Sequence, residues 1–256
     1  MTNKMALGAN EHNKQYHIAL TPGQPGEYAI LPGDPGRVEE IARRLSDPVF
    51  SAENREYKTY TGTLSGKRVC VMSTGIGGAS AAIAIEELIK CGVHTFIRVG
   101  TCGGMQHDIM PGDIIIASAA IRAEGTSNEY LPPGYPACAD FSVVSALCQA
   151  AKSAGLRHHT GIIHSKDSFY GQTEPDGMPI SEILKDRWNS YIRSGCLASE
   201  MEAAALFSVG LIRRVRVGAV LTVVWNPELH KAGVSQDHFS DNDRAISCAI
   251  EAIENL

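Results

Sequence analysis

Residues 67–104 read KRVCVMSTGIGGASAAIAIEELIKCGVHTFIRVGTCGG, and the order of signals in this stretch decides the fold. A β-rich run ends in the glycine turn Gly75–Gly78, a helical run follows as far as Gly92, and a second β-rich run, 94–104, ends in glycines again. A strand, a helix and a strand in succession are typical of an α/β domain.

The alternation continues on both sides of this stretch. Further β-rich runs are EYAILPG (27–33), PGDIIIASAAIR (111–122), GIIHSKDSF (161–169) and VRVGAVLTVVW (215–225). Helical periodicity occurs in DPGRVEEIARRL (34–45), DFSVVSALCQAAKSAG (140–155), SEILKDRWNSYIRSG (181–195), EMEAAALFSVGLI (200–212) and HFSDNDRAISCAIEAIENL (238–256). Because no repeat or linker interrupts this order, the sequence predicts one α/β domain over residues 1–256. Helices would cover both sides of its sheet, and residues 1–16 would form a mobile N-terminal arm.

The composition excludes several classes of function. The net charge is −5 and the basic residues are scattered, so nothing indicates nucleic-acid binding. The seven cysteines form no CxxC pair, which indicates reduced thiols, and the nine histidines lack the HExxH and HxxxH spacings of metal enzymes. No apolar signal core opens the sequence, and no window approaches the roughly 18 apolar residues of a membrane span. We therefore expect a cytoplasmic protein with neither a nucleic-acid nor a membrane partner.

Three glycine turns, at Gly33, Gly75–Gly78 and Gly100–Gly104, mark the place where a ligand would bind, since ligands of open α/β sheets collect at such strand ends. No GK[ST] follows these glycines, so none of them is a Walker loop, and the dinucleotide fingerprint GxGxxG is missing as well. The sequence therefore favours free phosphate over a nucleotide as the bound anion.

Three arginines could supply the positive charge. Asp34 is placed to cap a helix that begins at Pro35, which puts Arg37 in a first turn where only a bound anion near Gly33 would favour a cation. The alternative for Arg37 is an ordinary solvated side chain. Arg98 interrupts an apolar strand and needs an anionic partner, either a ligand at Thr101 or a distant structural carboxylate. For Arg55, an exposed cross-strand charge is the simplest interpretation.

The stretch SEMEAAALF (199–207) places two acids at the start of an apolar helical run. Glu200 and Glu202 are two positions apart, so on a helix they do not share a face. We expect one to cap or support the structure and the other to face a ligand. A carboxylate suits vicinal hydroxyls, so an acid beside a phosphate site predicts a sugar whose anomeric carbon meets phosphate.

With these glycine turns, arginines and paired acids, the chain resembles the uridine phosphorylases of the nucleoside phosphorylase family (NP-I type). The resemblance rests on HIALT, PGDPGRVEEIA, NREYKTYTG, STGIGGASAAIAIEEL, IRVGTCGG, DSFYGQ and SEMEAAALF, which occur in the family's order and spacing from His17 almost to the C-terminus. It implies the nucleoside phosphorylase fold, a single α/β domain with a central mixed sheet that is partly barrel-like and flanked by helices.

The resemblance also implies roles for individual residues. Phosphate would be held by Gly33, Arg37, Arg98 and Thr101, with Arg55 from a neighbouring subunit. Ribose would be held by Glu202 and the Met201 backbone, with Glu200 and Thr101 close by and His17 from the neighbour. The base would be held by Phe169 and Gln172. Catalysis would rest on Arg98, Thr101 and Glu202.

Assembly and ions follow from the same resemblance. No cofactor is expected, because phosphate is a co-substrate. The family's potassium site at the dimer interface matches Glu56, Ile76 and Ser80. The chain would form dimers grouped into a hexamer, a trimer of dimers, because two site residues come from the neighbour.

The base site departs from the family pattern. Many relatives carry arginines where this chain has Glu174 and the pair Asn226–Pro227. Lys166, three residues before Phe169, is the substitute cation that we predict, and its alternative is a solvated lysine at a strand end. An amide such as Asn226 cannot protonate a purine, which favours a pyrimidine.

The expected reaction is the reversible phosphorolysis of uridine to uracil and ribose 1-phosphate. Three alternatives stay open: a purine nucleoside phosphorylase, a nucleosidase that uses water, and a binding relative without catalysis.

Overall fold

A computed structural model describes residues 13–256. The strands are β1 (Tyr28–Pro32), β2 (Ser46–Asn54), β3 (Tyr57–Leu64), β4 (Lys67–Met72), β5 (Thr95–Gly104), β6 (Ile114–Ala123), β7 (Ala137–Cys138), β8 (His158–Lys166), β9 (Ala198–Glu200) and β10 (Arg216–Trp225). The helices are α1 (Gly36–Ala42), α2 (Gly78–Lys90), α3 (Phe141–Ser153), α4 (Phe169–Thr173), α5 (Ser181–Arg193), α6 (Ala203–Arg213), α7 (Pro227–Lys231) and α8 (Asp243–Asn255), with short 3₁₀ turns at Thr126–Glu129 and Pro175–Gly177.

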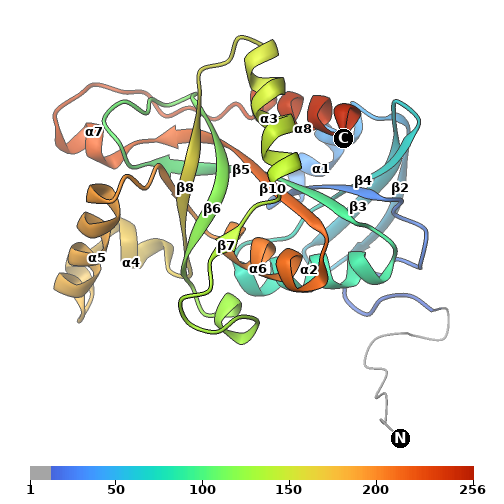
Figure 1. The fold of residues 1–256 in the computed structure, drawn as a ribbon, viewed down its shortest axis with the longest axis horizontal. Coiled ribbons are helices and arrows are strands. Elements are labelled where there is room, and N and C mark those ends of the chain that lie inside the picture. The colour runs from blue at the N-terminus through green and yellow to red at the C-terminus, as the bar shows by residue number, and fades with distance from the viewer. Residues whose placement is uncertain (1–12) are drawn as a thin grey trace, which may run out of the picture.

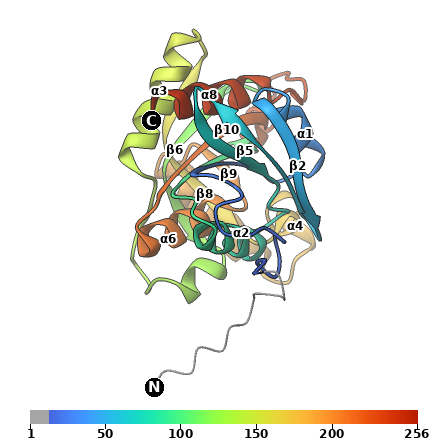
Figure 2. The same ribbon diagram turned by 90° about the vertical axis from the view of Figure 1, so that its right-hand side faces the viewer.

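The strands form one mixed sheet that closes partly on itself. Its order is β10-β6-β8-β9-β5-β1-β4-β3-β2, and β10 pairs with β5 as well as with β6, so five strands complete a barrel-like ring. β1 runs parallel to β4 and β5, whereas β2, β3 and β4 form an antiparallel extension. Figure 1 shows α2 and α6 on one side of the sheet and α3 and α8 on the other, and Figure 2 shows the same layers from the side. The predicted fold class is confirmed.

Two buried apolar clusters hold these layers together. Phe96 of β5 packs with the side chains of α2 and α6, whereas its neighbour Ile97 packs with those of α1, α3 and α8. Successive side chains of a strand point to opposite faces, so β5 is buried on both faces. This explains why its run of apolar residues is continuous rather than alternating, and it makes Arg98, in the middle of that run, a buried charge.

Two element boundaries near the site differ from the prediction. β5 does not turn at Gly100 but continues to Gly104, because Gly103 and Gly104 pair with β9 and Gly103 also pairs with β10. The helix expected from residue 200 begins at Ala203 instead, since the residues up to Glu200 are drawn into the sheet as β9. Tertiary pairing overrides the local helical pattern here.

The start of the first helix and the position of the first hairpin also differ from what the sequence predicted. The helix predicted from Pro35 begins at Gly36, and its N-cap is Pro35 rather than the predicted Asp34. Asp34 lies just before it, and its Oδ1 accepts the Gly36 N–H at 2.8 Å. The β-like run around Arg55 is the turn between two long strands, β2 and β3.

The predicted N-terminal arm is described only at its end. Residues 1–12 lie outside the described part of the chain. Gln15, by contrast, is buried, and its N–H donates to the Leu20 carbonyl at 2.8 Å. Along residues 13–256, no helix combines the length and the apolar character needed to cross a membrane.

Candidate active site

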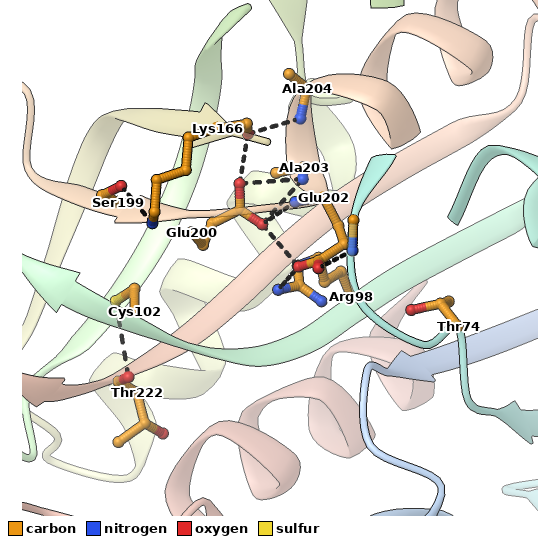
Figure 3. A network of polar contacts seen from close by, with 12 residues as sticks. Thr74, Arg98, Cys102, Lys166, Ser199, Glu200, Glu202, Ala203, Ala204 and Thr222 are labelled. Carbon is orange, nitrogen blue, oxygen red and sulfur yellow. Dashed lines mark hydrogen bonds and ion pairs between the residues drawn. The ribbon is translucent and has the colours of Figure 1, made fainter. Parts of the chain in front are cut away.

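One buried arginine is shared by two carboxylates. Arg98 donates from Nε to Glu200 Oε2 at 3.0 Å and contacts Glu202 Oε2 through Nη2 at 2.5 Å (Figure 3). All three residues are at most 5% exposed, so these charges compensate one another away from water. Of the two partners left open for Arg98, the structure shows the distant carboxylates, which occupy Nε and Nη2 and do not use Nη1.

A glycine makes room for this guanidinium. Gly100 lies two positions after Arg98 on the same face of β5, and a Cβ there would stand 2.9 Å from Arg98 Nη2 and 3.1 Å from Leu221. Only a residue without a side chain lets the guanidinium lie against the strand. Gly100 therefore serves the close approach of a side chain rather than a turn.

Glu200 caps helix α6. Its Oε2 accepts the backbone N–H groups of Glu202 (2.8 Å) and Ala203 (2.9 Å), and the hydroxyl of Ser165 donates to its Oε1. Ser165 in turn accepts the N–H of Ala204 at 2.9 Å. A negative charge at a helix N-terminus is favourable. The structural role expected for one of the two acids therefore belongs to Glu200.

Glu202 connects the arginine to the glycine turns. Its Oε1 accepts the N–H of Gly77 at 2.6 Å, in the turn between β4 and α2. Two residues earlier, the Gly75 N–H donates to the Gly33 carbonyl at 2.9 Å. Continuous contacts thus join Gly33, the Gly75–Gly78 turn, Glu202 and Arg98.

The other candidate phosphate ligands of this chain, Arg37 and Thr101, are both half-buried. Arg37 is half-buried in the first turn of α1. Thr101 is half-buried near the end of β5, where it pairs with Thr222 of β10. The Thr222 hydroxyl is buried, and within residues 13–256 it has no hydrogen-bond partner.

Burial and charge shift the pKa values of this cluster. Burial alone would lower the pKa of Arg98, but the carboxylates of Glu202 and Glu200 outweigh it and raise that pKa. Burial raises the pKa of Glu202, against the opposing effect of Arg98, and the nearby Glu200 raises it further. Burial likewise raises the pKa of the Cys102 thiol, which keeps it protonated and fits the packing role expected for it.

His17 is anchored to helix α2 of its own chain. Its Nδ1 lies 2.7 Å from Glu87 Oε1, and the backbone N–H groups of His17 and Ile18 donate to Glu87 Oε2 at 2.9 and 3.0 Å. Glu87 was not among the predicted site residues, because in the sequence it resembles any exposed acid of a helix. Its burial distinguishes it only in the structure.

Arg55 lies on the surface beside the predicted potassium ligands. It is exposed in the turn between β2 and β3, with a φ of 55°. The side chain of Glu56 packs on Gly75, and Ser80 Oγ donates to the Ile76 carbonyl at 3.2 Å. A carboxylate, a carbonyl and a hydroxyl thus lie around one turn, and such oxygen donors fit an alkali cation.

The predicted base-site residues are joined through a serine. Lys166 Nζ donates to Ser199 Oγ at 3.0 Å, Ser199 donates to Gln172 Oε1 at 2.7 Å, and Lys166 Nζ lies 5.9 Å from the centre of the Phe169 ring. Lys166 is 8% exposed, so the alternative of a solvated lysine is wrong. Burial lowers its pKa, and the carboxylates of Glu200 and Glu202 oppose that shift.

The two positions that depart from the family pattern lie away from this set of contacts. Asn226 is fully buried and caps α7, where its Oδ1 accepts the Glu228 N–H at 2.9 Å, and its Nδ2 donates to the Gln106 and Ile109 carbonyls at 2.8 Å each. Asn226 therefore holds the end of β10 in place. Glu174 is exposed after helix α4.

Sequence reasoning missed the serines that organise both halves of the site. Ser165 and Ser199 are buried on the paired strands β8 and β9. The only available signal was that each stands next to a residue already singled out, Lys166 and Glu200. Nothing local distinguishes such a serine from one that simply fills space.

Comparison with known proteins identifies the family. Residues 27–254 match the family model described as "Phosphorylase superfamily". The chain is 52% identical over 242 residues to a uridine phosphorylase of Treponema pallidum, covering 94% of each protein. It is 46% identical to a uridine phosphorylase of Thermococcus kodakarensis, covering 87% of this chain and 82% of that one, and 40% identical to a guanosine phosphorylase of Halorubrum lacusprofundi, covering 95% and 99%. This chain belongs to the phosphorylase superfamily.

Proposed function

We propose that this protein is a uridine phosphorylase, a pentosyltransferase that converts uridine and phosphate into uracil and ribose 1-phosphate. The observation that carries the proposal is the buried Arg98–Glu202 pair, held against the Gly75–Gly78 turn. A guanidinium suits an anion and a carboxylate suits hydroxyls, and here the two groups are in direct contact. The uridine phosphorylases among its relatives, at up to 52% identity over nearly the whole chain, support the same substrate.

Phosphate would bind where Arg98 meets the glycine turns. Its oxygens would take the donors of Arg98 and Arg37, the backbone at Gly33 and the hydroxyl of Thr101, with Arg55 supplied by a neighbouring subunit.

The ribose would bind at Glu202. The carboxylate would exchange part of its contact with Arg98 for the sugar hydroxyls, beside the Met201 backbone and Glu200, while His17 of a neighbour covers the 5′-hydroxyl. This exchange would keep both buried groups hydrogen-bonded, since Arg98 would turn to the phosphate dianion as Glu202 turns to the diol.

The chemistry needs placement and charge rather than a covalent enzyme intermediate. The glycosidic bond breaks with its electron pair leaving on uracil, and the ribose gains oxocarbenium character. The phosphate oxygen beneath the ring then bonds to the anomeric carbon, which gives ribose 1-phosphate, and the proton of the phosphate dianion passes to the uracil anion. Gln172 and Lys166 would stabilise the negative charge on the departing uracil, with Phe169 packed against the ring.

The assembly, the ion and the compartment are parts of the same proposal. Contributions of His17 and Arg55 from a neighbour require at least a dimer, and we propose a hexamer made of three dimers. Potassium would be held by Glu56, Ile76 and Ser80. The scattered charge and the free cysteines support a cytoplasmic location.

One assay tests the function and its rivals. Uracil release from uridine should require phosphate and should yield ribose 1-phosphate in equal amount. Release that proceeds equally well without phosphate would make the protein a nucleosidase. Because one relative is a guanosine phosphorylase, guanosine and inosine belong in the same assay, and faster turnover of either would assign the protein to purine nucleosides. No release from any of these nucleosides would leave a binding relative without catalysis.

A further inference from the structure

Ser199 has three hydrogen-bond partners, and none of them belongs to the sugar or phosphate network. Its Oγ lies 3.0 Å from Lys166 Nζ, 3.0 Å from His164 Nδ1 and 2.7 Å from Gln172 Oε1. The serine is 3% exposed, and the histidine and lysine beside it are buried as well. A hydroxyl has one proton to donate and two lone pairs, so three partners use its full capacity.

The direction of each bond follows from the chemistry of the partners. The ammonium of Lys166 can only donate, and the amide oxygen of Gln172 can only accept, so the single proton of Ser199 goes to Gln172. With the amide oxygen facing Ser199, as the structure has it, His164 donates from Nδ1 to the remaining lone pair. Burial and the neighbouring Lys166 lower the pKa of His164 to about 4, so its ring is neutral at pH 7. The donation to Ser199 assigns the one ring proton to Nδ1.

As long as His164 carries its proton on Nδ1, Ser199 allows only one orientation of the glutamine amide. If the amide of Gln172 turned over, its NH₂ would face an oxygen whose lone pairs are both occupied. Gln172 therefore keeps Oε1 toward Ser199, with a second lone pair to spare, and keeps its two Nε2 protons for another acceptor.

We propose that Ser199 is a positioning residue that fixes the Gln172 amide and thereby selects uracil over cytosine. The inference rests on the proposed function. The amide so held offers an acceptor beside a donor, which matches the N3–H and carbonyl of uracil. Cytosine presents the reverse pair, an acceptor at N3 and an amino group at C4, and would match only the turned amide.

Cytidine binding tests this selection without depending on cytosine as a leaving group. The measurement is the inhibition constant of cytidine against uridine turnover at saturating phosphate, divided by the KM of uridine. In Ser199→Ala the amide is free to turn over, and this ratio should fall about tenfold, the scale of one hydrogen bond that changes from mismatched to matched. A ratio within twofold of the wild type would overturn the proposal.

Two further variants separate positioning from packing. Ser199→Thr keeps the hydroxyl, so it should keep the ratio within about threefold of the wild type. Ser208→Ala is the matched control, because it removes another buried serine hydroxyl, one that has no partner within residues 13–256. It should leave the ratio unchanged, and a fall as large as that of Ser199→Ala would overturn the proposal.

The histidine tautomer gives a readout that does not depend on turnover. Nitrogen chemical shifts of His164 in the free wild-type protein should report a proton on Nδ1, and a proton on Nε2 alone would overturn the proposal. Wild-type protein that releases no uracil would instead refute the proposed function. If the wild type is active and Ser199→Ala leaves the ratio of the cytidine inhibition constant to the uridine KM unchanged, only the role of the serine is refuted.

Discussion

The two faces of the β8–β9 strand pair carry networks of opposite character. On one face, Ser165 and Glu200 are cross-strand partners that lead to Arg98 and the start of α6. On the other face, His164 and Ser199 are partners that lead to Gln172 on α4. Both networks are buried at the strands, and strand alternation alone assigns each residue to its face.

The two networks differ in the structural elements that they connect. The first connects elements of the core, since β5, α6 and the turn before α2 all contribute to it. The second ends on the short helix α4, where Phe169 is 54% exposed. The charged network is thus built into the core, whereas the second network ends where the sequence can change without unfolding the sheet. Under the proposed function, the first would serve sugar and phosphate and the second would serve the base.

The largest effect is expected when the charged network loses its cation. Arg98→Ala leaves two buried carboxylates without a partner, so activity should fall at least about a thousandfold and the free energy of unfolding should fall by about 3–5 kcal/mol. Denaturant titration and uracil release measure the two effects. Arg98→Lys, which keeps a charge, should recover most of the stability, and a stable but inactive lysine variant would separate the two roles.

The next largest effect distinguishes the two acids. Glu202→Gln keeps the shape but loses the carboxylate, and it should lower kcat/KM for uridine about a hundredfold while the thermal midpoint moves little. Glu200→Gln weakens the cap of α6 and should lower the midpoint more than Glu202→Gln does. The reverse order of midpoints would mean that the capping and ligand roles are exchanged.

On the other face, the neutral His164 predicts that the free energy of unfolding depends on pH. Between its ordinary pKa of 6.5 and its folded pKa of about 4, the unfolded chain binds a proton at His164 that the folded chain does not. Stability should therefore fall as pH drops through this window, by up to about 3 kcal/mol. His164→Gln should flatten the change in unfolding free energy between pH 7 and pH 4.5. An unchanged slope would place the titration elsewhere.

The smallest effect is expected when Lys166, the cation proposed to lie beside the base, loses its charge. Lys166→Met keeps the buried stem and removes the ammonium, and it should lower kcat for uridine about tenfold with little change in the KM of phosphate. Steady-state kinetics at varied phosphate provide the measurement. A larger change in phosphate KM than in kcat would connect Lys166 to the anion instead of the leaving base.

The sequence predicted the fold class and most elements because hydrophobic periodicity and glycine turns are local signals. It also assigned a structural role to one of two acids, and the structure shows that Glu200 caps α6. It could not show which anion Arg98 meets, because Glu200 lies 102 residues away and only the pairing of β5 with β9 brings the two together. The burial of Lys166 was hidden for the same reason, since it depends on the partner strand and not on its own neighbours.

The brevity of β9 has a consequence for insertions and deletions. This strand has only three residues, and two adjacent side chains, Ser199 and Glu200, serve opposite faces. Shifting its register by a single residue would exchange them, which would aim a carboxylate at the glutamine and a hydroxyl at the arginine. The loop from Ser194 to Leu197 should therefore keep its length among active relatives, while the exposed loop around Pro175 is free to vary.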